Sequence, residues 1–308
     1  MKAVILDSDS LGEGVDLSPI KNQVGELVCY PLTSPNQVDE RIQNADVVIT
    51  NKVVLNEASL KKAEKLKLVC VLATGMNNID LKAAEKLGIP VKNVEAYGTP
   101  SVVQHTLMMM LSLATKIPVM QKRMAAGDWQ KSPLFTLLDP PTFQLEGKRL
   151  VIVGSGELGQ AVKEQAEALG MRVTFTARPG KTDDSRPSFD ELLPEADVIS
   201  FHCPLTDETK GLLNRQNIKH CQPHTLVINN ARGGVANEHD VLDALRKGQI
   251  GGYATDVLPQ EPPKDGHPLL DALNEPLNLI VTPHNAWTSP EARQRIIELT
   301  AENISALK

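Results

Sequence analysis

One segment of the chain, residues 149–170, restricts the possible folds more than any other. The apolar run Arg149–Val153 leads into Gly154-Ser155-Gly156-Glu157-Leu158-Gly159, and a stretch of helical character follows that ends at Gly170. In this GxGxxG pattern the first glycine permits a tight turn, the second lets backbone N–H groups approach a pyrophosphate, and the third lets helix and strand pack closely. Because another strand-like run follows at 172–176, the segment predicts a strand–turn–helix–strand unit that binds a dinucleotide.

The rest of the chain alternates short apolar runs with polar segments long enough to form helices. Continuously apolar runs of this kind are typical of parallel strands that are covered on both faces. Strands are expected at 3–6, 26–30, 45–50, 68–73, 90–94, 149–153, 172–176, 197–202, 225–230, 252–257 and 278–283. Long helices are expected at about 100–126 and at 289–308. The predicted fold class is α/β, with two doubly wound parallel-sheet domains in series.

Length and composition agree with two ordinary globular domains. The chain has 308 residues, more than the roughly 250–300 at which a single hydrophobic core usually stops growing. A formal net charge of −6 argues against a nucleic-acid partner, which would need a basic surface. The four cysteines have no CxxC spacing, no histidine pair has the spacing of a metal site, and no apolar run suits a signal peptide or a membrane span. We therefore expect a cytoplasmic protein without a metal and without a membrane partner.

The end of the second strand in the dinucleotide unit bears on the choice of cofactor. NAD-binding sheets usually carry an acid there, which binds the ribose 2′-hydroxyl. In this chain the position is occupied by Ala177, and Arg178 follows it. An arginine can pair with a 2′-phosphate, so Arg178 favours NADPH, either tolerated or preferred. The alternative is that Arg178 points to solvent and that the protein accepts NADH and NADPH alike.

Three chemically active side chains follow predicted strands near the C-terminal end. They are Arg232 after residues 225–228, Glu261 after residues 252–257, and His284 after residues 278–281. Because ligands of an open α/β sheet bind at the carboxyl ends of the strands, the three side chains can meet in one crevice. A guanidinium suits a substrate carboxylate, and an imidazole beside a carboxylate can donate a proton to a carbonyl oxygen as hydride arrives. Three unrelated surface residues would show the same spacing, and that alternative stays open here.

Further matches follow one another in order along nearly the whole chain. They are Ala73–Asp80, Tyr97–Val102, Gly154–Gly159, His202–Thr206, Asn230–Gly234, Asp256–Pro262 and Thr282–His284. In these stretches the chain resembles the D-isomer-specific 2-hydroxyacid dehydrogenase family. The segments 285–287 and 291–296 are most similar to its bacterial glycerate dehydrogenase (hydroxypyruvate reductase) branch. The resemblance implies reduction of a short 2-keto acid to the D-2-hydroxy acid, with hydroxypyruvate converted to D-glycerate and glyoxylate to glycolate.

The resemblance also implies an architecture and a set of site residues. A substrate domain of residues 1–98 plus 288–308 would surround an NAD(P)-binding domain of residues 99–287, with the active site between them. His284 would be the proton donor, Glu261 its partner, and Arg232 the clamp on the substrate carboxylate. The substrate-binding residues would be Thr74, Gly75, Met76, Asn77, Arg232 and His284. The cofactor-binding residues would be Thr106, Gly154, Gly156, Glu157, Leu158, Gly159, Arg178, Pro204, Ala231 and Asp256.

The chain departs from the family pattern at two places. Ala177 replaces the usual acid, and Glu157-Leu158 replaces the commoner Arg-Ile. The first departure leaves strict NAD use in doubt, and the second leaves one pyrophosphate contact in doubt.

Two other functions remain open. One is the reduction of a different, phosphorylated or branched 2-keto acid, and the other is that of a dinucleotide-sensing corepressor without catalysis. The family implies a homodimer, for which the helix at 100–126 is the expected contact.

Overall fold

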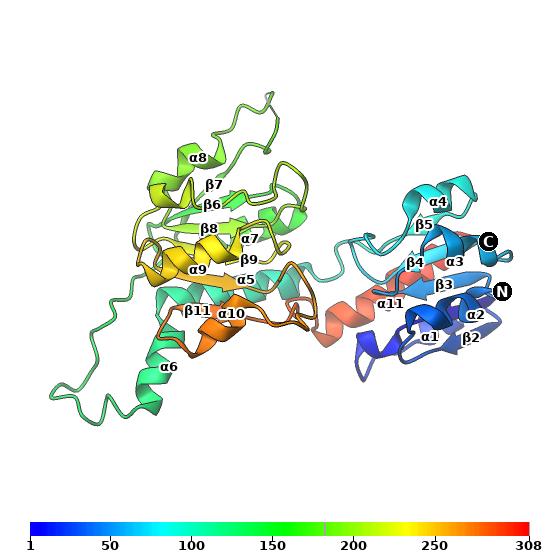
Figure 1. The fold of residues 1–308 in the computed structure, drawn as a ribbon, viewed down its shortest axis with the longest axis horizontal. Coiled ribbons are helices and arrows are strands. Elements are labelled where there is room, and N and C mark those ends of the chain that lie inside the picture. Colours follow the sequence, from blue (N-terminus) through cyan, green and yellow to red (C-terminus); the bar gives the residue numbers. More distant parts are fainter. Residues whose placement is uncertain (182, 308) are drawn as a thin grey trace. The chain divides into compact units, whose positions relative to one another are not determined.

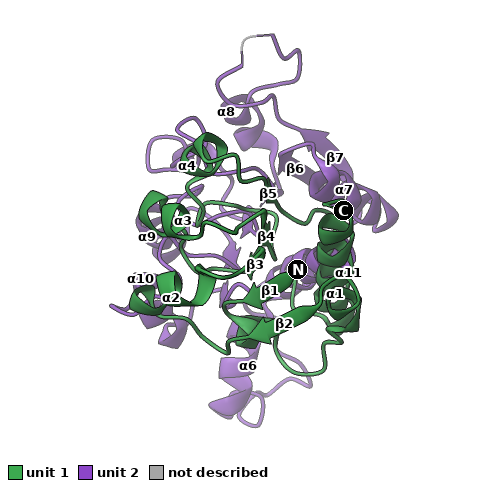
Figure 2. Cartoon of the chain, turned by 90° about the vertical axis from the view of Figure 1, so that its right-hand side faces the viewer, with its two compact units in different colours: residues 1–98, 287–308 green, residues 99–286 purple. Residues whose placement is uncertain are grey.

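The computed structural model describes residues 1–181 and 183–307 and divides into two compact units. Unit 1 comprises Met1–Gly98 and Trp287–Lys308, and unit 2 comprises Thr99–Ala286 (Figures 1 and 2). Unit 1 has a five-stranded sheet and unit 2 a six-stranded sheet, and all strand pairs in both are parallel. This confirms the predicted class of two doubly wound parallel sheets.

Unit 1 has the strand order β2-β1-β3-β4-β5, with Ala3 paired to Leu27 on one side and to Val47 on the other. The strands are β1 (Lys2–Ile5), β2 (Glu26–Cys29), β3 (Val47–Thr50), β4 (Leu68–Val71) and β5 (Val91–Lys92). The helices are α1 (Ser18–Lys21), α2 (Val38–Ile42), α3 (Glu57–Lys62), α4 (Leu81–Lys86) and α11 (Pro290–Ser305). Figure 1 shows α11 returning the end of the chain to this unit.

Alternating side chains of β1 explain why helices cover both faces of the unit 1 sheet. Val4 packs into a core with α2, α3 and α4, whereas Ala3 and Ile5 pack into the opposite core with α1 and α11. Successive side chains of a strand point to opposite faces, so a strand that is apolar at every position needs cover on both. Three of these helices, α3, α4 and α11, begin at side-chain caps, as at Asp80, whose carboxylate accepts from the Ala83 N–H at the start of α4.

Unit 2 has the strand order β11-β10-β9-β8-β6-β7. Its strands are β6 (Arg149–Val153), β7 (Arg172–Phe175), β8 (Val198–Phe201), β9 (Leu226–Asn229), β10 (Gly252–Thr255) and β11 (Leu279–Val281). Its helices are α5 (Thr99–Ala114), α6 (Ile117–Ala125), α7 (Glu157–Ala168), α8 (Phe189–Leu192), α9 (Glu238–Arg246) and α10 (Pro268–Asp271). Each of the eleven expected apolar runs therefore overlaps a strand.

The unit 2 sheet is also covered on both faces, and its topology marks a place for a ligand. Helices α5 and α7 pack on one face, and α8, α9 and α10 pack on the other. The chain runs from β6 to the edge strand β7 and then crosses back to β8 on the other side of β6. Such a switch point opens a crevice beyond the carboxyl ends of the strands. The Gly-rich turn follows β6 and therefore lies at this point.

The prediction of one helix over about 100–126 is wrong. The structure has two helices, α5 and α6, at an angle of 59°. Lys116 separates them with a φ of 57°, a left-handed backbone that an α-helix cannot contain. No single helix in the described ranges is long and apolar enough to cross a membrane, although α5 and α6 together meet the criteria of length and composition.

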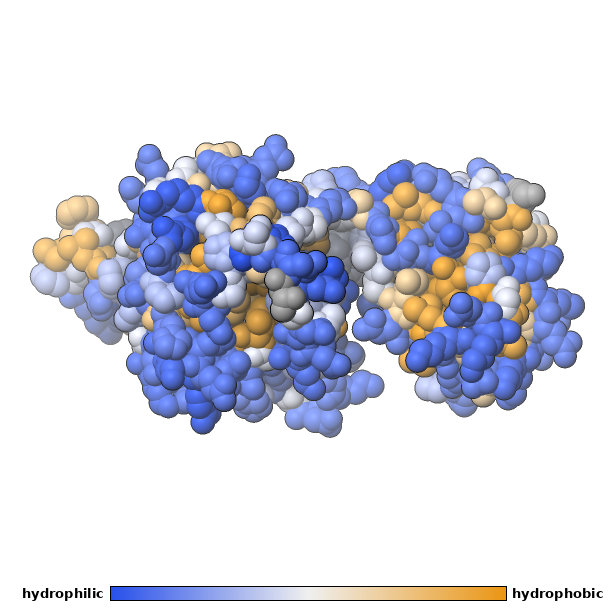
Figure 3. All heavy atoms as spheres, turned by 90° about the horizontal axis from the view of Figure 1, so that it is seen from above, coloured by the Kyte–Doolittle hydropathy of each residue, from blue (hydrophilic) through white to orange (hydrophobic). Residues whose placement is uncertain are grey.

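A segment of residues 126–146, which we call the arm, follows α6 and projects from the rest of unit 2 (Figure 1). Its apolar side chains are exposed to an unusual degree, with Phe135 at 91% and Leu138 at 75%. Figure 3 shows an apolar patch on the projecting end of unit 2. Large apolar side chains are costly to hydrate, so this segment is a candidate for contact with another surface.

Candidate functional site

The Gly-rich turn has the close backbone packing that its sequence predicts. Gly154 has a φ of 107°, and a Cβ atom there would lie 2.5 Å from the carbonyl oxygen of His202. A Cβ atom at Gly159 would lie 2.0 Å from the Gly154 oxygen, so helix α7 can approach β6 only with a glycine at this position. A Cβ atom at Gly156 would meet nothing within 4 Å. The backbone beside Gly156 is thus open at the N-terminus of α7, where N–H groups and the helix dipole favour a pyrophosphate.

The first residue of α7 introduces a negative charge at this otherwise anion-binding turn. Glu157 is exposed, and its Oε1 accepts a hydrogen bond of 2.5 Å from the Thr99 hydroxyl. Leu158 is half-buried and carries no charge. The open turn that the sequence predicts is therefore present. The Glu157 carboxylate is tied to the start of α5, and it pairs with no basic side chain within residues 1–181 and 183–307.

His284 and Glu261 form a direct pair at the ends of neighbouring strands. The Nδ1 atom of His284 lies 2.6 Å from Oε2 of Glu261, and Oε1 of Glu261 accepts from the Leu258 N–H at 2.8 Å. The side chains are 30% and 33% exposed, so a small ligand can reach them. The carboxylate fixes the orientation of the ring and leaves Nε2 as the ring nitrogen that can face a ligand.

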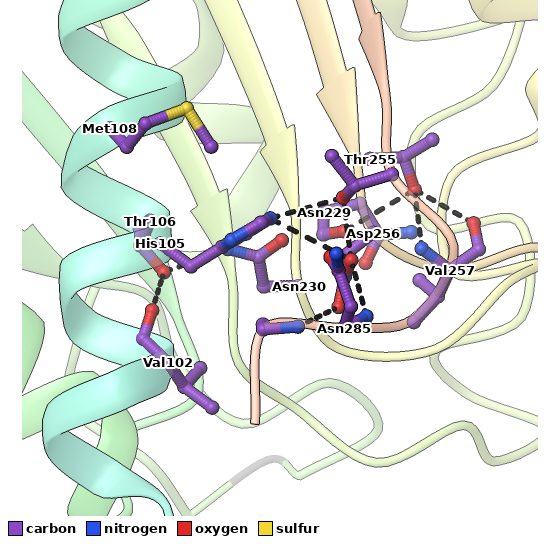
Figure 4. Close-up of polar contacts among 12 residues, drawn as sticks. Val102, His105, Thr106, Met108, Asn229, Asn230, Thr255, Asp256, Val257 and Asn285 are labelled. Atoms are coloured by element: carbon purple, nitrogen blue, oxygen red, sulfur yellow. Dashed lines mark hydrogen bonds and ion pairs between the residues drawn. The ribbon is translucent and has the colours of Figure 1, made fainter. Parts of the chain in front are cut away.

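Asp256 holds the turn that carries His284, and Figure 4 shows its side chain beside Asn285 of this turn. Its carboxylate, 2% exposed, accepts from the N–H groups of Asn285 and Ala286, each at 2.9 Å, and from the Thr282 hydroxyl at 2.5 Å. Its backbone oxygen accepts from the His284 N–H at 2.8 Å. These bonds hold His284 at a φ of 54°, a conformation that non-glycine residues rarely adopt. The predicted cofactor contact of Asp256 stays a prediction, and in the structure this residue holds the turn at residues 282–286.

Arg232 lies on a loop that packs against the segment leading to Glu261. The Asn229 side chain braces this loop by donating to the Arg232 oxygen at 3.0 Å and accepting from the Ala231 N–H at 3.1 Å. A Cβ atom at Gly233 would lie 2.0 Å from the backbone of Leu258, so the two loops touch along their backbones. The Arg232 side chain is exposed, and its Nη1 donates to the Ala231 oxygen at 2.7 Å. The structure thus brings the segments that carry Arg232, Glu261 and His284 to one edge of the unit 2 sheet.

The remaining predicted cofactor contacts differ in accessibility. Pro204 is exposed, whereas Ala231 is 6% and Thr106 0% exposed. The Thr106 hydroxyl donates to the Val102 oxygen and accepts from the Asn230 side chain, each at 2.8 Å. Thr106 therefore joins α5 to the Arg232 loop through Asn230, and in the described conformation its hydroxyl is covered by protein.

In unit 1, the predicted substrate loop follows β4. Thr74 and Asn77 are exposed, and the loop is tied down by Asn93, which donates to the Thr74 oxygen at 2.8 Å. The N–H groups of Gly75, Met76 and Asn77 make no hydrogen bond with another residue in the described part of the chain. Unpaired N–H groups at an exposed turn are suited to bind an anion.

Arg178 lies beside a pocket of about 410 Å³ at the end of β7. Lys181 and Lys210 line the same pocket, together with the acidic residues Glu208 and Asp190. The Arg178 N–H donates to Asp184, and Asp184 forms an ion pair with Arg186 at 2.6 Å. Hydrogen bonds from Arg186 and Arg178 hold the pKa of the Asp184 carboxyl well below its usual range. The rim of the pocket thus carries three cationic side chains, Arg178, Lys181 and Lys210.

Several residues that support the site were not predicted from the sequence. Besides Asn229 and Thr282, they include Glu238, whose buried Oε1 accepts from the Gly234 N–H at 2.7 Å and so fixes the end of the Arg232 loop. Burial raises the pKa of the Glu238 carboxyl. A polar residue four positions after a glycine is too common to be a signal. Within residues 1–181 and 183–307, no group of three or more His, Cys, Asp or Glu side chains is placed to hold a metal ion.

Comparison with known proteins agrees with this geometry. Residues 107–286 match the family model of the NAD-binding domain of D-isomer specific 2-hydroxyacid dehydrogenases. The chain is 38% identical over 307 residues to glycerate dehydrogenase of Methylorubrum extorquens, covering 99% of this chain and 95% of that protein. It is 36% identical over 313 residues to hydroxypyruvate reductase of Blautia hydrogenotrophica, with coverage of 99% and 96%. A crystal structure of a Thermus thermophilus protein superimposes with a TM-score of 0.80, at 29% identity and coverage of 100% and 96%.

The Gly-rich cradle and the histidine–carboxylate pair at the strand ends define an oxidoreductase that uses a nicotinamide dinucleotide and a small-molecule substrate. More particularly, the chain belongs to the D-isomer specific 2-hydroxyacid dehydrogenase family. The activity of the family is the interconversion of 2-keto acids and D-2-hydroxy acids.

Proposed function

We propose that this dehydrogenase reduces hydroxypyruvate to D-glycerate, with glyoxylate as a second, smaller substrate. The observation that carries the proposal is the pair of His284 Nδ1 and Glu261 Oε2 at 2.6 Å, a proton donor held in place beside the Arg232 loop. The choice of keto acid is supported by the names of the two relatives that match over nearly their full length. No residue described above supports the alternative of a corepressor without catalysis.

Each site residue has a separate role in the proposed reduction. Arg232 pairs with the substrate carboxylate through its fork of N–H donors. In unit 1, the N–H groups of Gly75, Met76 and Asn77 stay a predicted anion-binding group. A bound reduced nicotinamide supplies the hydride for the keto carbon. His284 gives its Nε2 proton to the carbonyl oxygen, and Glu261 stabilises the imidazolium before the transfer. The product is the 2-hydroxy acid, and His284 is left neutral.

For the cofactor, we propose that NADPH is accepted at least as well as NADH. The support is the pocket at the end of β7, where Ala177 stands in place of an acid and Arg178, Lys181 and Lys210 bring positive charge. A 2′-phosphate carries up to two negative charges, so this rim favours it, whereas an acid at Ala177 would repel it.

We also propose a homodimer formed by unit 2. Helices α5 and α7 leave an apolar groove of about 590 Å³, lined by residues that include Val103, Leu107, Met108 and Leu111. The exposed arm residues Leu134, Phe135 and Leu138 have the size and polarity to fill such a groove. In a dimer with twofold symmetry, the arm of each copy would lie in the groove of the other copy. Both arms and both grooves would then be buried.

The experiment that tests the function compares initial rates on a panel of 2-keto acids with NADH and NADPH side by side. The panel contains hydroxypyruvate, glyoxylate, pyruvate, a branched keto acid and a phosphorylated one. The proposal expects the highest kcat/KM for hydroxypyruvate, lower for glyoxylate. A preference of more than about tenfold for the branched or phosphorylated acid would replace the proposed substrate. Tight NADPH binding without turnover of any keto acid would reject the enzymatic function itself.

A further inference from the structure

A histidine outside the catalytic pair makes contact with the structure that holds His284. His105 lies on α5, and its side chain is 15% exposed. Its Nε2 atom is 3.0 Å from the Thr282 hydroxyl oxygen. The same atom is 3.6 Å from Oδ1 of Asp256, toward which the ring points in Figure 4. His105 is thus a side chain from another element, 177 positions before Thr282, that reaches the Thr282–Asp256 contact.

The hydrogen bonds around Thr282 determine which ring nitrogen of His105 carries the proton. The single hydroxyl hydrogen of Thr282 is donated to Asp256 Oδ1 at 2.5 Å. The Thr282 oxygen can therefore only accept from His105, so Nε2 is the protonated nitrogen of the neutral ring. The result is a chain of donors in one direction, from His105 through Thr282 to the Asp256 carboxylate. Hydrogen bonds in such a chain polarise and strengthen one another.

The Asp256 carboxylate, which accepts the last of these hydrogen bonds, holds the turn at His284 in its conformation. Asp256 accepts from the N–H groups of Asn285 and Ala286, and its backbone oxygen accepts from His284. A φ of 54° at His284 persists only where neighbouring contacts hold it. A carboxylate that is free to turn would loosen that turn, and the imidazole would lose its alignment with Glu261.

We infer that His105 is a positioning residue for His284, acting through Thr282 and Asp256. The inference rests on the proposed role of His284 as proton donor. His105 touches neither of the reacting groups described above, and its contribution is to fix the Asp256 carboxylate from the α5 side. Burial lowers the pKa of His105, an effect that the charge of Asp256 partly opposes. A lowered pKa leaves the ring neutral near pH 7, and the hydrogen bond to Thr282 then fixes its one proton on Nε2.

The test uses two substitutions at His105 in the full-length protein. His105→Leu removes the donor, while His105→Gln keeps an N–H group near the position of Nε2. We expect His105→Leu to lower kcat by about tenfold to a hundredfold with little change in KM for NADPH, because the Gly-rich cradle is untouched. His105→Gln should restore most of kcat. Met110→Val, in the core on the same helix, is the matched control and should lower Tm while leaving kcat near that of the wild type.

A double-mutant cycle then asks whether His105 acts through Thr282. Thr282→Val removes the hydroxyl at nearly constant volume. If the chain of donors is correct, the double variant His105→Leu/Thr282→Val loses no more activity than the more impaired single variant. Independent, multiplicative losses would overturn the proposed path, and so would a ¹⁵N NMR spectrum that places the His105 proton on Nδ1. The same assays on the wild type distinguish the two possible failures. If the wild type turns over the keto acid, such a result rejects only the role of His105, whereas a wild type without turnover rejects the proposed function.

Discussion

Nδ1 of His284 lies 2.6 Å from Oε2 of Glu261, although 23 positions separate the two residues in the sequence. The contact depends on two backbone arrangements, the turn that Asp256 holds at His284 and the Leu258 N–H that binds the other oxygen of Glu261. Both oxygens of the carboxylate are therefore committed, one to the imidazole and one to the backbone. The pair is held in one orientation, because neither side chain can rotate without losing a bond.

Removal of either member of the pair should affect turnover more than binding. We expect His284→Ala to lower kcat by about a hundredfold or more and Glu261→Gln by about tenfold, since the amide still holds the ring but carries no charge. KM for the keto acid should change little in either variant because Arg232 remains. Steady-state rates on hydroxypyruvate measure both effects. Turnover of His284→Ala close to that of the wild type would reject the assigned role.

The cofactor prediction concerns Arg178 and the acid that faces it. Arg178→Ala should raise KM for NADPH by about tenfold and leave KM for NADH nearly unchanged, because only the former has a 2′-phosphate. Glu208→Gln is the complementary variant. A hydrogen bond from the Thr206 hydroxyl, with smaller effects of Lys181 and Arg178, lowers the pKa of Glu208, so this side chain is an anion that competes for the same cations. Its removal should lower KM for NADPH. Equal changes for both cofactors after Arg178→Ala would show that the residue acts elsewhere.

The dimer prediction concerns the arm. Phe135→Ser should shift the protein from dimer to monomer in sedimentation velocity at micromolar concentration, because it removes a 91% exposed ring from the proposed contact. Leu32→Ser is a matched control, since Leu32 is 69% exposed and belongs to unit 1. It should leave the sedimentation coefficient unchanged. A monomeric wild type under the same conditions would rule out the proposed dimer.

The strands and the family could be predicted from the sequence, but the contacts that orient the site could not. Apolar runs bounded by polar segments are local signals, and GxGxxG joins them to a known turn geometry. The break at Lys116 was missed because a single left-handed residue has no reliable signal when it is a lysine. The roles of Thr282 and His105 depend on a contact across 177 positions, which no local pattern contains. Arg232, Glu261 and His284 could be proposed as site residues from the sequence because each follows a strand of a recognisable sheet.

Replacement of Glu157 is expected to strengthen the binding of the cofactor. Its carboxylate lies in the first turn of α7, near the open backbone at Gly156 where the pyrophosphate is expected. Glu157→Gln should lower KM for NADH and NADPH by about threefold at low salt, and the gain should shrink at high ionic strength. The same change should lower Tm slightly, because an acid in the first turn stabilises a helix. Unchanged KM values at low salt would place the carboxylate too far from the cofactor to matter.

The stability of unit 2 should fall on mild acidification, and His202 is the main cause. Its Nε2 lies 2.8 Å from the Ser200 hydroxyl, its Nδ1 is buried, and burial lowers its pKa to about 4. In the unfolded chain a histidine takes up a proton near pH 6.5, so between about pH 6.5 and about pH 4 the unfolded state binds more protons. The free energy of unfolding should therefore fall as the pH drops through this window, by an amount on the order of 3 kcal/mol from this residue. His202→Gln should flatten the dependence in urea titrations across that range, leaving a smaller slope from His105 and His267, whose pKa values burial also lowers. Superimposable curves for variant and wild type would mean that His202 is protonated in the folded protein.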